Sequence, residues 1–263
     1  MPDADALYRS RRYKEALSQA KKDAARDPRD YYAFGSGLTI GRSLVMLGRY
    51  RTAQKQLEDL TNDKQRGSLY GPHFTYAGLA NWFGGRPERA VEIWEAGLKA
   101  GYQAQEGMEI RWVLMYAAAR NPKSYPRDKA RQLIEDRAKR IYQRCGEYFT
   151  SQFILKQQSY EQVLENLTAA YTGQFQAQII RTYRTLLDFF AGVHALLDRD
   201  EDRFFEQMLT CASIDVREPI TAEMAIAERE IQQGSPKWKR RLSMQLRPDS
   251  VSASAMKSSR RAR

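Results

Sequence analysis

Apolar residues recur along this chain at spacings of three and four residues almost everywhere. That spacing places them on one face of an α-helix, and no segment shows the alternation typical of a β-strand. Helix-breaking residues interrupt the pattern at intervals, for example at Asp27-Pro28, Asn121-Pro122 and Pro219. The pattern predicts an all-α protein with about a dozen short helices joined by short loops.

The clearest regularity is an interval of 37 residues between small side chains in the first part of the chain. Small residues on two neighbouring helices allow the helix axes to approach closely. We therefore expect pairs of antiparallel helices, with the larger Leu57 and Trp94 filling the space towards the next pair. The members of the series are Ala16, Ala53 and Ala90, Gly41 and Gly78, and Gly48 and Gly85.

Larger residues extend this series into a motif. In the three clearest segments its members are Leu7, Tyr8, Tyr13, Ala16 and Ala20, then Gly41, Leu44, Gly48, Tyr50 and Ala53, then Gly78, Trp82, Gly85, Ala90 and Trp94. The motif resembles the tetratricopeptide repeat (TPR) family, whose units are helix-turn-helix pairs of about 34 residues. The likeness is clear over about residues 1–100 and loose to about 215. It implies a right-handed α-solenoid of TPR-like helical hairpins with a concave face.

The charge is unevenly distributed along the chain. There are 43 Lys and Arg against 32 Asp and Glu, a net charge of +11. Residues 234–263 hold nine basic residues and one acid, so this segment carries +8 and residues 1–233 carry only +3. We therefore expect a TPR-like helical domain over 1–233, closed by a capping helix over 220–232, and a basic, flexible tail over 234–263.

In the tail, Trp238, Leu242 and Leu246 fall at i, i+4 and i+8 among basic residues, which outlines a short basic amphipathic helix. Such a helix could contact an acidic protein, an anionic membrane or nucleic acid. A broad nucleic-acid surface on the body is not expected, because its net charge is small. The tail candidates are Lys237, Trp238, Lys239, Arg240 and Arg241.

No motif for catalysis, metal binding or a cofactor is found. His73 and His194 are isolated in the sequence, and Cys145 and Cys211 have no further cysteine partners for a zinc site. No apolar run is long enough to span a membrane, and the N-terminus does not resemble a secretion signal. We expect a cytoplasmic protein that is not an enzyme and needs no metal or cofactor.

The TPR resemblance also implies which side chains line the concave groove. A protein-binding surface favours arginine, aromatic and methionine side chains, and Arg42 with Trp82 would suit a carboxylate-bearing or helical peptide. The same side chains could instead pack against a neighbouring repeat. The groove candidates are Tyr8, Arg9, Arg42, Met46, Leu79, Trp82, Phe83 and Arg111.

The leading hypothesis is a protein-binding module whose partner is a protein or peptide, possibly acidic. It would act as an adaptor, an assembly chaperone or a toxin-neutralising immunity protein. The alternative is a nucleic-acid-associated protein that binds through the basic tail. The oligomeric state is left open by the sequence.

Overall fold

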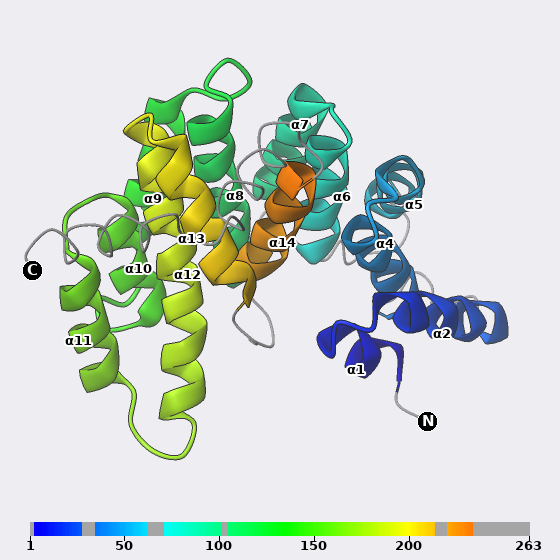
Figure 1. Ribbon diagram of the computed structural model, residues 1–263, viewed down its shortest axis with the longest axis horizontal. Helices are drawn as coiled ribbons and strands as arrows, with labels where there is room; N and C mark the ends of the chain where they lie inside the picture. Colours follow the sequence, from blue (N-terminus) through cyan, green and yellow to red (C-terminus); the bar gives the residue numbers. More distant parts are fainter. Residues whose placement is uncertain (1–2, 28–34, 63–70, 101–104, 214–219, 234–263) are drawn as a thin grey trace, which may run out of the picture. The chain divides into compact units, whose positions relative to one another are not determined.

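The computed structural model describes residues 3–27, 35–62, 71–100, 105–213 and 220–233. Within these ranges the chain forms thirteen α-helices and no strand, which confirms the predicted all-α class (Figure 1). No helix in the described ranges is long and apolar enough to cross a membrane. The helices are α1 (Ala4–Arg9), α2 (Tyr13–Arg26), α4 (Ser36–Met46), α5 (Tyr50–Asn62), α6 (Gly71–Phe83), α7 (Pro87–Lys99), α8 (Gln105–Arg120), α9 (Arg127–Ala138), α10 (Gly146–Ile154), α11 (Tyr160–Ala170), α12 (Gln176–Leu197), α13 (Glu201–Ser213) and α14 (Ile220–Gln233).

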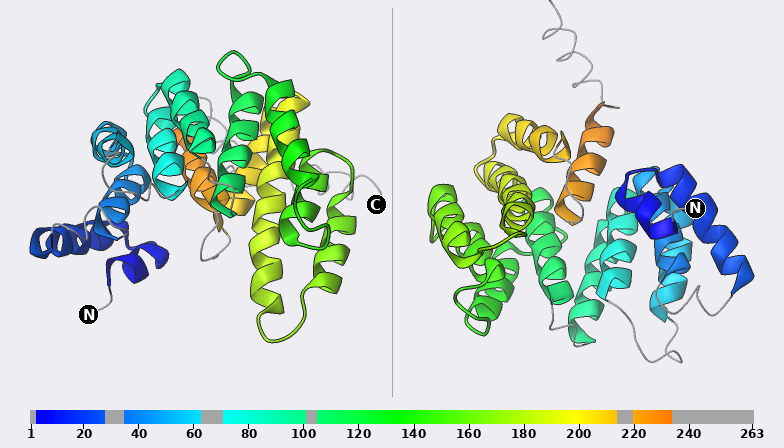
Figure 2. Two further views of the ribbon diagram at one scale, coloured as in Figure 1. Left: turned by 180° about the vertical axis from the view of Figure 1, so that it is seen from behind. Right: turned by 90° about the horizontal axis from the view of Figure 1, so that it is seen from below.

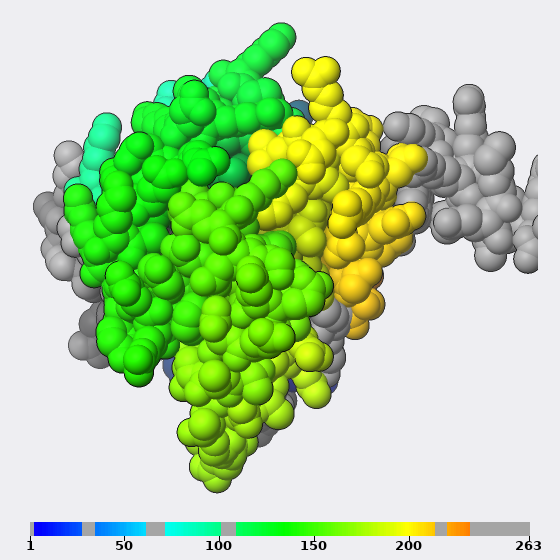
Figure 3. All heavy atoms as spheres, turned by 90° about the vertical axis from the view of Figure 1, so that its left-hand side faces the viewer, coloured from blue at the N-terminus to red at the C-terminus, as the bar shows by residue number. Residues whose placement is uncertain are grey.

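The chain divides into two compact units, Met1–Ala227 and Glu228–Arg263. All packing described below belongs to the first unit. There, successive helices pack as the pairs α1–α2, α4–α5, α6–α7, α8–α9, α10–α11 and α12–α13 (Figure 2). Each pair also packs on the next one along the chain, and α12 packs on α8 in addition. The helices α9 to α13 form most of the coloured surface in Figure 3.

The first three pairs share one backbone turn, which recurs at the 37-residue interval. Arg11, Gly48 and Gly85 have positive φ angles of 59°, 68° and 80°. At Gly48, the glycine N–H donates to the Val45 carbonyl and the following N–H donates to the Leu44 carbonyl. This is the Schellman arrangement that ends a helix and reverses the chain. The repeating glycines therefore mark the turn inside the second and third pairs, and Arg11 occupies the same position in the first.

The same turn ends α10 and α12, but with other residues. Lys156 and Arg199 have φ angles of 58° and 62°. Their backbone hydrogen bonds repeat the pattern, with the Lys156 N–H donating to the Phe153 carbonyl and the Arg199 N–H to the Leu196 carbonyl. Five of the six pairs therefore contain this turn.

The interval also marks the closest contact between paired helices. A Cβ atom added to Gly41 would lie 2.2 Å from Leu57 Cδ2, and one added to Gly78 would lie 2.0 Å from Trp94 Nε1. The large side chain therefore packs on the glycine of its own pair. This differs from our expectation that Leu57 and Trp94 fill the space towards the next pair. The reason is that glycine, lacking a Cβ, leaves room for a large side chain directly above it.

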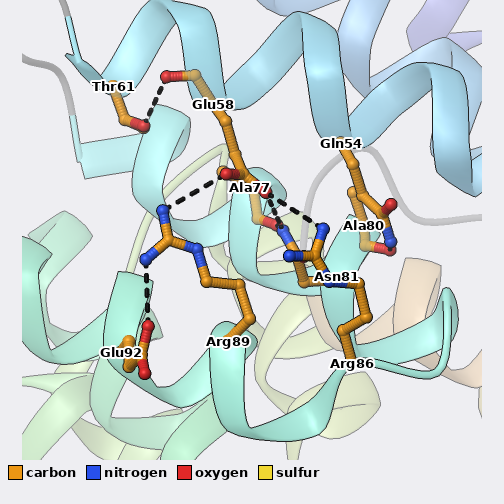
Figure 4. A network of polar contacts seen from close by, with 9 residues as sticks. All are labelled: Gln54, Glu58, Thr61, Ala77, Ala80, Asn81, Arg86, Arg89 and Glu92. Atoms are coloured by element: carbon orange, nitrogen blue, oxygen red, sulfur yellow. Dashed lines mark hydrogen bonds and ion pairs between the residues drawn. The ribbon is translucent and has the colours of Figure 1, made fainter.

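A polar network joins the second pair to the third (Figure 4). The Glu58 carboxylate on α5 accepts hydrogen bonds from Asn81 Nδ2 at 2.9 Å and from Arg89 Nη2 at 3.2 Å, and Arg86 Nη1 lies 3.9 Å away. Gln54 Nε2 donates to the Ala80 carbonyl at 3.1 Å. One carboxylate thus links α5 to both helices of the next pair.

The predicted final helix is confirmed as α14, and its first half is buried on nearly every side. It contacts the beginning of the chain: Tyr8 on α1 donates a hydrogen bond to Glu223, 215 residues away. It also lies near α13, where Cys211 Sγ is 3.9 Å from the Thr221 carbonyl oxygen. The buried residues of this half are Ile220, Thr221, Ala222, Met224, Ala225, Ile226 and Ala227.

Candidate functional site

A pocket of about 420 Å³ opens between six helices from both ends of the described chain. Helices α1, α2, α4, α6, α8 and α14 each contribute to its wall. Tyr8, Arg9 and Arg42, three of the predicted groove residues, lie together here. We call it the Arg42 pocket. The structure therefore brings together three of the four groove candidates of the first two helical pairs.

Arg42 contacts three residues of the pocket wall. Its side chain is only 13% exposed, and its guanidinium lies 3.9 Å from the centroid of the Tyr8 ring, a cation–π contact. Nη2 pairs with the Asp5 carboxylate and donates to Thr39 Oγ1 at 3.3 Å. These contacts fix the guanidinium in one orientation.

The Asp5 carboxylate forms ion pairs with two arginines. Besides Arg42, it pairs with Arg9, four residues later on α1, at 2.5 Å. Burial opposes ionisation of Asp5, but the hydrogen bonds and charges of Arg42 and Arg9 hold its pKa below the ordinary value. Asp5 is therefore a carboxylate at neutral pH. Arg9 remains 46% exposed and presents its guanidinium at the pocket.

Glu223 is held by tyrosine hydroxyls on the other side of the pocket. Tyr8 donates its hydroxyl hydrogen to Glu223 Oε1 at 2.7 Å. Burial, followed by the charge of Glu223, raises the pKa of both Tyr8 and Tyr76 well above the ordinary value. Both phenols are therefore protonated donors at any physiological pH.

The pocket is suited to binding. Its aromatic and charged side chains are fixed by neighbours, and the buried Nε of Arg42 makes no hydrogen bond to any part of the chain that the structure describes. Across the described ranges, no three His, Cys, Asp or Glu side chains are placed to hold a metal ion. Guanidinium groups and tyrosine rings at one opening are typical of protein-recognition surfaces.

The remaining groove candidates lie elsewhere. Leu79 is only 1% exposed and belongs to the hydrophobic core, so it offers no binding surface, because the next helices cover that face of α6. Trp82 packs against Trp94 and Tyr116, with ring centroids 5.9 and 5.7 Å away, and its Nε1 donates to Tyr116 Oη at 3.3 Å. Trp82 is not among the residues that line the Arg42 pocket.

Met46, Phe83 and Arg111 also do not line the pocket. Met46 is half-buried against a small cluster around Tyr8, and the Phe83 ring lies 6.1 Å from that of Tyr50. Arg111 on α8 lies near other arginines, described below. The tail candidates Lys237, Trp238, Lys239, Arg240 and Arg241 lie outside the described residues.

Sequence reasoning missed several residues that line the pocket, among them Asp5, Tyr76 and Glu223. One signal was present for Glu223. It is the only charged residue in the otherwise apolar run from Ile220 to Ala227, and a single carboxylate on a buried helix requires hydrogen-bond donors. Nothing in the sequence indicated that α1 would supply one of those donors.

Comparison with known proteins adds no family assignment: no protein-family model matches the chain, and no curated protein sequence matches it.

Proposed function

We propose that this chain is a protein-binding module built on TPR-like helical pairs in a right-handed solenoid, and that the Arg42 pocket receives a segment of its partner. The recurring turn at Arg11, Gly48 and Gly85 and the contacts of Gly41 and Gly78 support the TPR-like repeat. In such an array the first helices of successive pairs form one binding face. Helices α1, α4 and α6, which line the pocket, are those first helices.

The observation that carries the proposal is the set of side chains around the opening. Tyrosine and arginine are among the residue types most enriched at interface hot spots, the positions where substitution by alanine weakens binding strongly. Here they are held in place before any partner arrives, by the Arg42–Asp5 pair and the Tyr8–Glu223 hydrogen bond. Preorganised side chains lose little conformational entropy on binding. The tyrosine and arginine residues that line the pocket are Tyr8, Tyr13, Tyr76, Arg9, Arg11 and Arg42.

The partner segment is expected to carry a carboxylate near the exposed Arg9. Asp5 is the one carboxylate that pairs with both Arg9 and Arg42 in the described structure. A carboxylate from the partner would add a charged acceptor for these guanidinium groups. The pocket volume of about 420 Å³ leaves room for a few side chains rather than a whole helix.

Photo-crosslinking in the native cell tests this proposal. A photoreactive benzoyl-phenylalanine replaces Arg9 at the opening, and the same residue replaces Arg131, an exposed arginine on α9, as the matched control. We expect a discrete polypeptide adduct from position 9 and none of the same mass from position 131. Equal adducts from both positions would contradict the proposal.

Once that polypeptide is identified, binding by purified variants gives the energetic test. Arg9→Ala and Arg42→Ala should each weaken binding by about 30-fold, as expected for truncation of a central interface arginine. Arg131→Ala, which removes the same charge from a distant surface, should leave binding unchanged. Circular dichroism on Arg42→Ala checks that helicity is retained, because this side chain is largely buried.

A further inference from the structure

The turn between α9 and α10 places an exposed aromatic ring among cations. Tyr142 is 70% exposed, the highest value among the large hydrophobic side chains of the described residues. Lys139, Arg140 and Arg144 beside it are also exposed. Backbone hydrogen bonds fix the turn, from the Arg140 N–H to the Arg137 carbonyl at 2.9 Å and from the Cys145 N–H to the Tyr142 carbonyl at 3.1 Å. The ring therefore stands on an ordered backbone.

Two further arginines, from two other elements, lie next to this turn. Arg137 lies in the last turn of α9, and its Nη2 is 3.6 Å from Glu147 Oε2, with both side chains 18% exposed. Arg111, on α8, is half-buried. Burial, and then the charges of Arg137 and Arg140, lowers the pKa of Arg111, so these guanidinium groups are close enough to repel one another. Glu147 is the carboxylate that offsets this repulsion.

The guanidinium groups of Arg111, Arg137 and Arg140 thus lie near one another in a partly buried place, beside the Arg137–Glu147 pair. Such an arrangement costs free energy in the unbound protein, because like charges repel more strongly where water is partly excluded. An anion that enters would remove this cost. The buried Nε of Arg137 also makes no hydrogen bond to any described residue. The chemistry therefore favours a ligand with discrete negative groups, such as phosphates.

We infer that this surface binds single-stranded nucleic acid, with phosphates on Arg111, Arg137, Arg140 and Arg144 and a base stacked on Tyr142. We call it the Tyr142 surface. Proteins that bind single strands combine a cationic track with aromatic rings on which bases stack. An acidic peptide would use the cations but not the ring. A membrane surface would need several exposed apolar side chains, and the described part of this turn presents only Tyr142.

The near-neutral charge of residues 1–233 does not contradict this inference. A net charge is an average over the surface, whereas binding depends on local clustering. Arg111 is 26 positions before Arg137 in the sequence, and only the packing of α8, α9 and α10 brings them together.

Fluorescence anisotropy with a labelled single-stranded oligo(U) of twelve nucleotides tests the ring. The full chain is used throughout, so that the tail at 234–263 is the same in every sample. Tyr142→Ala should weaken binding by about tenfold, as expected when one stacked base loses its aromatic partner. Phe175→Ala is the matched control, since Phe175 is 60% exposed but has no basic neighbours in sequence, and it should have no effect. Equal affinities for the Tyr142 and Phe175 variants would overturn the inference.

A salt series tests the cations. Arg140→Ala with Arg144→Ala should make the slope of log affinity against log salt less steep by about 1 to 1.5, because each lost phosphate contact contributes about 0.7. Arg127→Ala with Arg131→Ala, two exposed arginines on α9, removes the same net charge and should leave the slope unchanged. Equal slopes in the two double variants would exclude phosphate contacts at this turn.

Crosslinking then locates the site independently of the tail. A 4-thiouridine-containing oligo(U), irradiated with the full chain and digested with trypsin, should modify the peptide of residues 141–144, which contains Tyr142. Modification confined to residues 234–263 would assign binding to the tail and overturn the inference. The inference would also be overturned if a poly-glutamate peptide or phosphatidylserine vesicles bound the chain as tightly as oligo(U) does, and if this binding did not depend on Tyr142.

Discussion

The first three helical pairs, up to Lys99, and the later pairs from α8 onwards build the same turn from different residues. In the first region two of the three turns place a glycine, Gly48 or Gly85, at the positive φ and the other places Arg11 there, whereas the second region uses only Lys156 and Arg199. A side chain with a Cβ in this conformation costs about 1–2 kcal/mol, which the surrounding helix contacts offset. The pairing of helices therefore continues where its glycine signature ends.

One pair from each region, α6–α7 and α12–α13, shows a difference in how rigid the contact at its glycine is. In α6–α7 a Cβ on Gly78 would meet the ring of Trp94, which is fully buried and donates a hydrogen bond to the Thr75 carbonyl at 3.1 Å. In α12–α13 a Cβ on Gly192 would lie 2.7 Å from Met208 Cε, the end of a flexible side chain. The contact of a glycine with a large side chain is therefore fixed in the first of these pairs and adjustable in the second.

The largest expected effect tests this difference in rigidity. Gly78→Ala should lower the free energy of unfolding by about 3 kcal/mol, because neither the ring nor the backbone can move away. Gly192→Ala should lower it by about 1 kcal/mol or less, because Met208 can change its rotamer. Urea denaturation followed by circular dichroism measures both. Equal losses would show that the two contacts are equally rigid.

A smaller effect is expected at the turns. Gly85→Ala should lower the free energy of unfolding by about 1 kcal/mol, because alanine is strained at a φ of 80° although nothing lies within 4 Å of the added Cβ. Arg199→Gly should raise it by about 0.5 kcal/mol, since glycine relieves the strain but adds freedom to the unfolded chain. Thermal melting of both variants provides the measurement, and opposite signs are the expected result. Two losses of equal size would mean that Arg199 is not strained.

The smallest expected effect is a change in how stability depends on pH, and it arises from a residue in the second region. His194 on α12 lies against Phe153, and one of its ring nitrogens is 3.1 Å from the Ile154 carbonyl oxygen. Burial lowers the pKa of His194 in the folded protein. Below about pH 6.5 the unfolded chain therefore binds a proton that the folded chain does not, so stability is complete above that pH and decreases on acidification.

His194→Gln removes this titration. Its melting temperature should fall less between about pH 7 and pH 5.5 than that of the unchanged protein, because the carboxylates titrate mainly at lower pH. Parallel melting curves for the two proteins across this range would contradict the assignment of the pH dependence to His194.

Part of the candidate site could be predicted from the sequence. Tyr8, Arg9 and Arg42 follow from the positions that line the groove in the resembled family, and the structure places all three at one pocket. The same reasoning included Leu79, which the core covers, and Trp82, which packs against Trp94 and Tyr116. A helical period identifies one face of a helix, but it does not distinguish an open groove from a face that another helix covers.

The sequence by itself determined the helical class, the turns at Gly48 and Gly85 and the small residues at Gly41 and Gly78, because these depend on local backbone preferences and on contacts within one pair. Only the tertiary structure decided that Glu223 meets Tyr8, and that Arg111 joins Arg137. Both depend on how distant helices pack, and side-chain contacts of that range leave no periodic trace in the sequence.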